Sequence, residues 1–111
     1  MSERELQRRV MRMAKHYGWR RAHFKAAPLK NRGGRYVTPQ DGEAGFPDCV
    51  FVRDGRLLFV ELKAEQGVIS DGQLAWLHEL RQVVLQSLGA VRVFVWRPQD
   101  WDDGTIEEIL K

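Results

Sequence analysis

Two acidic residues and a lysine stand where they could form a hydrolytic site. Asp48 follows Pro47, and Glu61 comes thirteen residues later in an apolar run that closes with Leu62 and Lys63. Carboxylate oxygens are ligands for hard cations such as Mg²⁺ or Mn²⁺, and a nearby ammonium group stabilises negative charge that develops on a phosphate. These residue types therefore fit metal-assisted hydrolysis of a phosphodiester bond.

A β-hairpin would bring these residues together. Asp54-Gly55 lies between two hydrophobic runs, which is typical of a two-residue hairpin loop. The resulting register places Asp48 directly opposite Glu61, where the Cβ atoms of a facing pair are roughly 4.5–5.5 Å apart and like charges repel. A cation between the two acids would remove that repulsion. Lys63 shares the face of Glu61, because side chains two residues apart in a strand point the same way.

The hairpin strands are expected to lie in the interior of a sheet. One face would hold Cys49, Phe51, Leu58, Val60 and Leu62, and the other Val50, Val52, Leu57 and Phe59. Strands that are apolar on both faces are buried, and unpaired charges are rare there. This context favours a site over the alternative, in which Asp48 only opens a strand after a proline and Glu61 and Lys63 form a solvated polar pair.

A helix is predicted from Ser2 to about Tyr17. Ser2 and Glu5 have the spacing of a capping box, and an apolar stripe follows at helical spacing: Leu6, Val10, Met13, Ala14 and Tyr17. Glu3 falls within the span of that stripe and is expected to face inward, whereas Glu5 points away and caps the helix. Acids in a first helical turn are also favoured by the helix dipole, so a purely structural role for Glu3 stays open.

Charge is distributed unevenly along the chain. Residues 1–36 carry a net charge of +9 and residues 37–111 a net charge of −6. Such a basic front is expected of a protein that binds a polyanion, although a basic amphipathic helix can also be a solvated face or lie on a membrane surface. The candidate DNA-binding residues are Arg4, Arg8 and Arg12 in the helix and Lys30, Arg32 and Arg35 in a long Gly- and Pro-containing loop from Ala26 to Ala44. That loop is either a basic arm near the nucleic acid or a plain linker.

Further elements complete an α/β pattern. A strand is expected from Trp19 to Phe24, a second helix from Ser70 to Gly89, a strand from Val91 to Trp96 and a short terminal helix near Thr105. The apolar positions of the second helix are Leu74, Leu77, Leu80, Val84 and Leu88. Gln73 completes a capping box with Ser70, which explains its presence without any role in a site.

The overall composition fits one domain covering residues 1–111. The chain has 43% hydrophobic and 30% charged residues, which is ordinary for a globular protein. Its one cysteine, Cys49, excludes an internal disulfide and is expected to be a buried small hydrophobe. No stretch approaches the roughly 18 apolar residues of a membrane span, so we expect no membrane partner and a cytoplasmic location.

The ordered motifs resemble a known family. An early helical glutamate, Gly45-Phe46-Pro47-Asp48, Glu61-Leu62-Lys63 and Ser70-x-x-Gln73 together resemble the virus-type replication-repair nuclease (VRR-NUC) domain, a branch of the PD-(D/E)XK nucleases. The resemblance covers nearly the whole chain. It implies a restriction-endonuclease-like α/β core with a mixed sheet, in the order helix, strand, strand, strand, helix, strand.

The resemblance also implies roles for individual residues. Asp48 and Glu61 would hold Mg²⁺ or Mn²⁺ with the backbone carbonyl of Leu62, and Lys63 would act with them. The pattern Glu-x-x-Leu-Gln assigns the helical metal-site carboxylate to Glu3 rather than Glu5, and the family places a glutamine at Gln73 pointing into the site.

The expected function is that of a metal-dependent DNA endonuclease. Standalone family members resemble Holliday-junction resolvases, which implies a homodimer that acts on branched, flap or four-way-junction DNA. The main alternative is a non-catalytic nucleic-acid-binding module derived from a nuclease fold. A phosphohydrolase acting on small nucleotides is disfavoured by the basic helix and by the lack of a Gly-rich phosphate loop.

Overall fold

The computed structural model of the protein describes residues 1–24, 29–30, 36–37 and 41–111. Its helices are α1 (Glu3–His16), α2 (Asp71–Gln86), α3 (Pro98–Asp102) and α4 (Thr105–Leu110), and its strands are β1 (Arg20–His23), β2 (Leu29–Lys30), β3 (Tyr36–Val37), β4 (Cys49–Arg53), β5 (Arg56–Leu62) and β6 (Val91–Trp96). The fold is a mixed α/β fold, as predicted. Among the described residues, no helix is long and apolar enough to cross a membrane.

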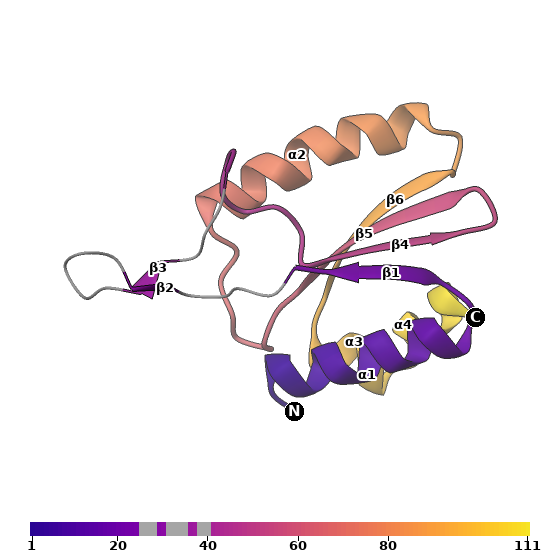
Figure 1. The fold of residues 1–111 in the computed structure, drawn as a ribbon. Coiled ribbons are helices and arrows are strands. Elements are labelled where there is room, and N and C mark those ends of the chain that lie inside the picture. The colour runs from indigo at the N-terminus through magenta and orange to yellow at the C-terminus, as the bar shows by residue number, and fades with distance from the viewer. Residues whose placement is uncertain (25–28, 31–35, 38–40) are drawn as a thin grey trace.

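Four strands form the main sheet in the order β1-β4-β5-β6. Strands β1, β4 and β5 pair antiparallel, whereas β5 and β6 pair parallel because α2 connects them as a crossover. Helix α2 lies over one face of the sheet, and α1, α3 and α4 lie over the other (Figure 1). Both hairpin strands are therefore interior strands, as their two apolar faces predicted.

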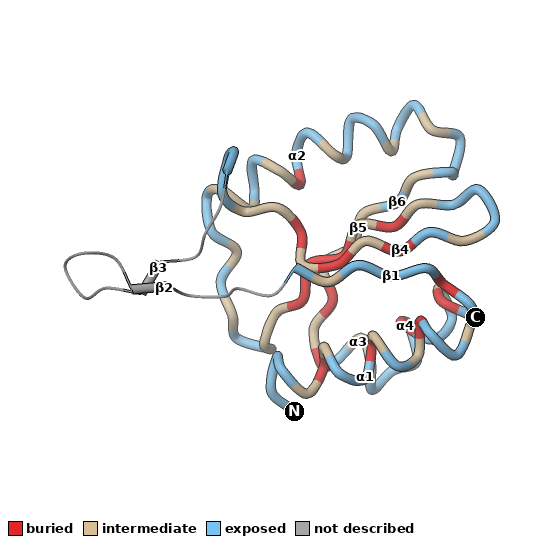
Figure 2. Tube along the Cα trace, viewed as in Figure 1, coloured by how far each residue is buried: buried red, intermediate tan, exposed pale blue. Residues whose placement is uncertain are grey.

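The two faces of the sheet are buried to different degrees. The core that the sheet forms with α1 and α4 contains Leu6, Val10, Ala14, Trp19, Cys49, Phe51, Leu58, Val60, Leu62, Trp96, Ile106 and Leu110. Buried residues gather on this side in Figure 2, whereas Leu77 is the buried residue of α2. On the α2 side, Val52 remains 43% exposed and Leu74 50%.

The predicted hairpin and its register are confirmed. Asp54 and Gly55 both have positive φ, at 49° and 77°, as the two central residues of a type I′ turn require. The turn pairs Arg53 with Arg56, and the last paired residues at the other end are Cys49 and Val60. Cys49 is fully buried, also as predicted, and burial raises the pKa of its thiol to about 12.

Helix α1 begins as predicted, but its cap is only half of a capping box. The Ser2 side chain accepts a hydrogen bond from the Glu5 amide at 3.0 Å. The Glu5 carboxylate does not return a bond to Ser2 and instead forms ion pairs with Arg8 and Arg9. Two arginines one turn further along the helix attract the carboxylate more strongly than one neutral amide does.

One predicted helix end and one predicted loop are wrong. Helix α2 ends at Gln86 instead of near Gly89, because the Ser87 hydroxyl donates to the Val84 carbonyl and accepts from the Val91 amide. Leu88 is consequently 99% exposed and takes no part in helix packing. The segment expected to be a plain loop contains β2 and β3, which pair antiparallel. Strands of two residues are too short to show a period in the sequence.

Candidate active site

Asp48 is held at the end of the sheet by bonds from two neighbouring strands. It lies one residue before β4, so the hairpin register continues to place it opposite Glu61. Its carboxylate oxygen Oδ2 accepts from the Leu62 amide at 2.9 Å, and its carbonyl oxygen accepts from the Phe24 amide at 2.9 Å. The predicted facing pair of acids is therefore present, and these two hydrogen bonds fix the position of Asp48.

Glu61 is a buried acid beside a second acid. Its relative exposure is 2%, and it is the buried charged residue of the described chain. Burial raises the pKa of Glu61 to about 8, and the charge of Asp48 and a hydrogen bond between the two carboxyl groups act in the same direction. Without a cation, Glu61 therefore keeps a proton at neutral pH that an ordinary glutamic acid would have lost.

Gln73 makes the contacts of both alternatives that the sequence left open. Its Oε1 atom accepts from the Ser70 amide at 2.9 Å, and the Ser70 hydroxyl accepts from the Gln73 amide, which completes the capping box of α2. Its Nε2 atom donates to Glu61 Oε1 at 2.9 Å. One carboxamide thus fixes the start of a helix and orients a site carboxylate.

Lys63 continues the pairing of β5 with β6 by one step. Its amide donates to the Trp96 carbonyl at 3.0 Å, and its positive charge lowers the pKa of Glu61 against the effects of burial. The loop after it is held by Arg97, whose Nη1 atom donates to the carbonyls of Ala64 at 2.7 Å and Gly67 at 2.8 Å. The ammonium group that the sequence predicted beside the acids is therefore close enough to act on Glu61.

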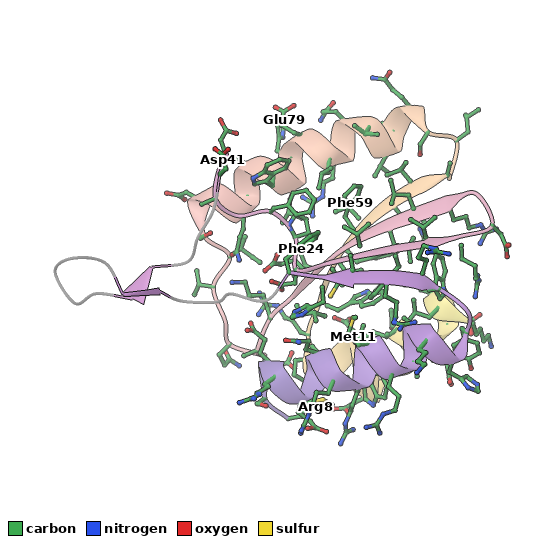
Figure 3. All side chains as sticks on the ribbon, in the orientation of Figure 1. Arg8, Met11, Phe24, Asp41, Phe59 and Glu79 are labelled. Atoms are coloured by element: carbon green, nitrogen blue, oxygen red, sulfur yellow. The ribbon has the colours of Figure 1, made fainter. Side chains whose placement is uncertain are left out.

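An aromatic cluster that the sequence did not predict anchors the segment before Asp48. The Phe46 ring makes edge contacts with three rings, with centroids 5.5 Å from Phe24, 5.9 Å from Phe59 and 5.0 Å from Trp76. Figure 3 shows Phe24 and Phe59 on the sheet, and Phe46 links both to α2. The aromatic residue before Pro-Asp was the only sequence signal for this cluster.

Gly45 allows the same segment to approach α2 closely. Its φ is 103°, and a Cβ atom at this position would lie 2.4 Å from the carbonyl carbon of Gly72. Two backbones therefore touch where any other residue would separate them. This contact fixes the segment of Asp48 against the helix turn that carries Gln73.

Glu3 lies in a hollow with Asp48, but it is exposed. The hollow has a volume of about 470 Å³ and is lined by Glu3, Arg4, Gln7, Arg8, His23, Phe24 and Asp48. The expectation that Glu3 faces inward is wrong as regards burial, because the residue is exposed, but Glu3 lies beside Asp48 and its charge adds to the effect of burial in raising the pKa of Glu61. In the described part of the chain, no group of three or more His, Cys, Asp or Glu side chains is arranged to hold a metal ion.

The structure describes some of the predicted DNA-binding residues but not all of them. Arg4, Arg8 and Arg12 are exposed on α1, and Figure 3 shows Arg8 on the side of this helix away from the sheet. Lys30 belongs to β2. Arg32 and Arg35 lie outside the described residues.

The chemistry of the acidic pair suits a hard cation. The charge of Asp48 adds to burial in raising the proton affinity of Glu61, the two side chains offer adjacent oxygen donors, and a bound divalent cation would replace the proton on Glu61. Mg²⁺ is commonly held by one or two carboxylates together with waters and substrate phosphates, so two side-chain ligands are sufficient for this ion. The residues present fit the predicted cofactor.

These features define a mixed α/β domain with an acidic pair and a lysine at one end of its central strands. Residues 3–97 match the VRR-NUC domain, and the chain belongs to this family, which implies a nuclease-type function. No curated protein matches the chain, and no solved structure does.

Proposed function

We propose that the protein is a divalent-metal-dependent DNA endonuclease with a restriction-endonuclease-like PD-(D/E)XK core. The observation that carries the proposal is the facing pair of Asp48 and Glu61 with the charge of Lys63 acting on it. A protein that only bound DNA would have no use for a buried acid and a half-buried acid that repel phosphates. Membership in the VRR-NUC family supports the same reaction class.

In this proposal the two acids bind Mg²⁺ or Mn²⁺, with the backbone carbonyl of Leu62 as a further ligand. Glu3 contributes from the hollow it shares with Asp48, directly or through a water molecule. Such a cation supplies the acidity that turns a water molecule into a nucleophile, and it neutralises charge on the phosphoryl oxygens.

The protein's own groups orient the reaction. The Leu62 amide holds Asp48 and the Gln73 carboxamide holds Glu61, so both carboxylates are fixed before substrate binds. The Lys63 ammonium either orients the attacking water or stabilises the negative charge that builds up on the phosphate as the bond to the leaving oxygen breaks.

DNA approaches along α1 in this proposal. Arg4 and Arg8 line the hollow that contains Asp48, and contacts from arginines to phosphates position DNA without reading its sequence. The small surface of one chain favours a homodimer, in which two-fold symmetry presents two sites to two strands. We expect branched, flap or four-way-junction DNA to be preferred over plain duplex.

Cleavage assays on labelled single-stranded, duplex, flap and four-way-junction DNA test the proposal. The wild type, Lys63→Ala and the control Lys111→Ala are compared in Mg²⁺, Mn²⁺ and chelator. Lys111 pairs with Glu108 at the far end of the fold, so its variant should cut as the wild type does. We expect cutting only with metal and a loss of at least a hundredfold for Lys63→Ala.

A different result would replace the proposal. If wild type and Lys63→Ala bind DNA equally well in chelator and neither cuts any substrate with metal, the chain is a nucleic-acid-binding module. If Lys63→Ala cuts at the wild-type rate, Lys63 takes no part in the reaction and its assignment to the site is wrong.

A further inference from the structure

A groove separate from the acidic hollow runs between α1 and the C-terminal helices. It has a volume of about 680 Å³, and its lining includes Arg8, Arg9, Arg12, His16, Tyr17 and Trp101. One wall is the basic face of α1, and the other comes from α3 and α4. We call it the α1–α3 groove.

The basic wall can exchange its partners for phosphates. Arg8 and Arg9 both pair with Glu5, and their hydrogen bonds hold the pKa of that carboxyl below its usual value. These pairs are exposed, so each is worth little in water and a phosphate can displace the carboxylate. Arg12 is exposed and forms no ion pair among the described residues, which leaves its guanidinium ready for an anion.

The other wall offers a flat ring beside an arginine. Trp101 is partly exposed, and the Arg9 guanidinium lies 5.9 Å from its ring centroid. Aromatic rings next to basic side chains are the usual platform for unpaired bases, because every base has a face that stacks. Bases within a duplex cover one another's faces, so a ring in the wall of a groove can stack only on an unpaired one.

The groove and the acidic hollow adjoin at Arg8. Arg8 lines both, so a strand that leaves Asp48 passes Arg8 and then follows α1. This helix has 14 residues and is therefore about 21 Å long, which corresponds to about six nucleotide steps of a stacked strand.

We propose that the α1–α3 groove binds the unpaired nucleotides of the same DNA strand that enters the acidic hollow. Trp101 stacks on a base, and Arg12 contacts a phosphate. The inference rests on the proposed function, since it names the form of substrate that function acts on. It predicts that DNA with a single-stranded arm binds more tightly than a blunt duplex of equal length.

Fluorescence anisotropy in chelator tests the groove without any cleavage. The probes are fluorescein-labelled 15-nucleotide oligo-dT, a blunt duplex, and the same duplex with an oligo-dT arm. The variants are Trp101→Leu, Arg12→Ser and the control Arg56→Ser, which removes an exposed arginine from the distant hairpin turn. Circular dichroism verifies that each variant is folded.

Each variant has its own expected signature. Trp101→Leu should weaken binding of oligo-dT about tenfold or more with an unchanged salt slope, and should weaken the blunt duplex much less. Arg12→Ser should make the salt slope for oligo-dT shallower by about 0.7. Arg56→Ser should match the wild type. If Trp101→Leu does not fold, Arg12→Ser and the milder Trp101→Phe still give the comparison.

The inference is overturned if Trp101 and Arg12 variants bind oligo-dT as the wild type does, or if Trp101→Leu weakens duplex and oligo-dT equally. A failure of the proposed function gives a different pattern: oligo-dT binding would depend on Trp101 although no DNA is cut. If cleavage depends on metal and Lys63 but oligo-dT binding does not depend on Trp101, only the proposal for the α1–α3 groove is overturned.

Discussion

The metal-free protein should lose stability as the pH rises through neutrality, and Glu61 should be the cause. The pKa of Glu61 rises from 4.5 to about 8 on folding, chiefly because the side chain is buried. The folded state therefore holds a proton that the unfolded chain releases above its lower pKa, so the stability is complete below about pH 4.5 and falls as the pH rises towards 8. At 1.36 kcal/mol per pKa unit, the loss between about pH 5 and pH 8 is on the order of 3 kcal/mol.

Urea unfolding in chelator, followed by circular dichroism at several pH values, measures this loss. Glu61→Gln keeps the shape and removes the charge, so its free energy of unfolding should vary far less with pH and should exceed that of the wild type at about pH 8. Glu79→Gln, an exposed change on α2, should retain the wild-type slope. Adding Mg²⁺ at high pH should stabilise the wild type more than Glu61→Gln, because only the wild type gains two charged ligands.

Two results would refute this reasoning. If Glu61→Gln has the same pH slope as the wild type, the extra proton is held by another group. If the wild type shows no slope between about pH 5 and pH 8, Glu61 is not held uncharged in a buried position in the folded protein, and the explanation of its raised pKa fails.

Three further predictions concern the surroundings of the site. Gly45→Ala should destabilise the protein by roughly 1–3 kcal/mol more than Gly42→Ala. Both glycines have positive φ, but only a Cβ atom at residue 45 would collide with the α2 backbone. Urea unfolding of both variants measures the difference, and equal losses of stability would disprove the close contact. Glu5→Gln should free Arg8 and Arg9 from their ion pairs. In an anisotropy titration, DNA binding should then be roughly two- to fivefold tighter and depend more steeply on salt. Weaker binding would mean that those arginines do not reach DNA. The lysine of Arg97→Lys cannot reproduce the hydrogen bonds to the loop after Lys63. In this variant kcat should therefore fall roughly ten- to a hundredfold with little change in KM, and the amide hydrogens of residues 64–67 should exchange faster. Unchanged exchange would show that the loop is ordered without Arg97.

The hairpin explains why part of the site could be predicted from the sequence. Asp54-Gly55 sets a local turn, and a strand period of two carries the register from that turn to Asp48 and Glu61 without knowledge of any other element. The capping boxes of the helices are local in the same sense. The complete box at Ser70 and Gln73 also aims a side chain at Glu61, so a local motif pointed to a contact of the candidate site.

The remaining features depend on contacts between distant segments. Phe46 meets rings from β5, from α2 and from Phe24 just after β1, and no pattern within its own segment reveals these partners. Glu5 was given to the helix cap because its spacing from Ser2 fits, but the outcome depended on competition with two arginines for the same carboxylate. The helical period places Glu3 on the inward side of α1, but it does not say whether other residues cover that position, and Glu3 is exposed.

The hydrogen bond from the Phe24 amide to the Asp48 carbonyl also determines how the protein can vary. The chain leaves the sheet at Phe24 and enters it again at Asp48, which lies beside Phe24. The contacts of Gly45 and Phe46 hold the segment just before Asp48 in place. Because doubling the length of a loop costs only about 0.6 kcal/mol in closure entropy, the connection between Phe24 and Gly45 can be lengthened, shortened or exchanged while Asp48 keeps its position. A recognition segment inserted into this connection should therefore leave the pairing of Asp48 with Glu61 unchanged.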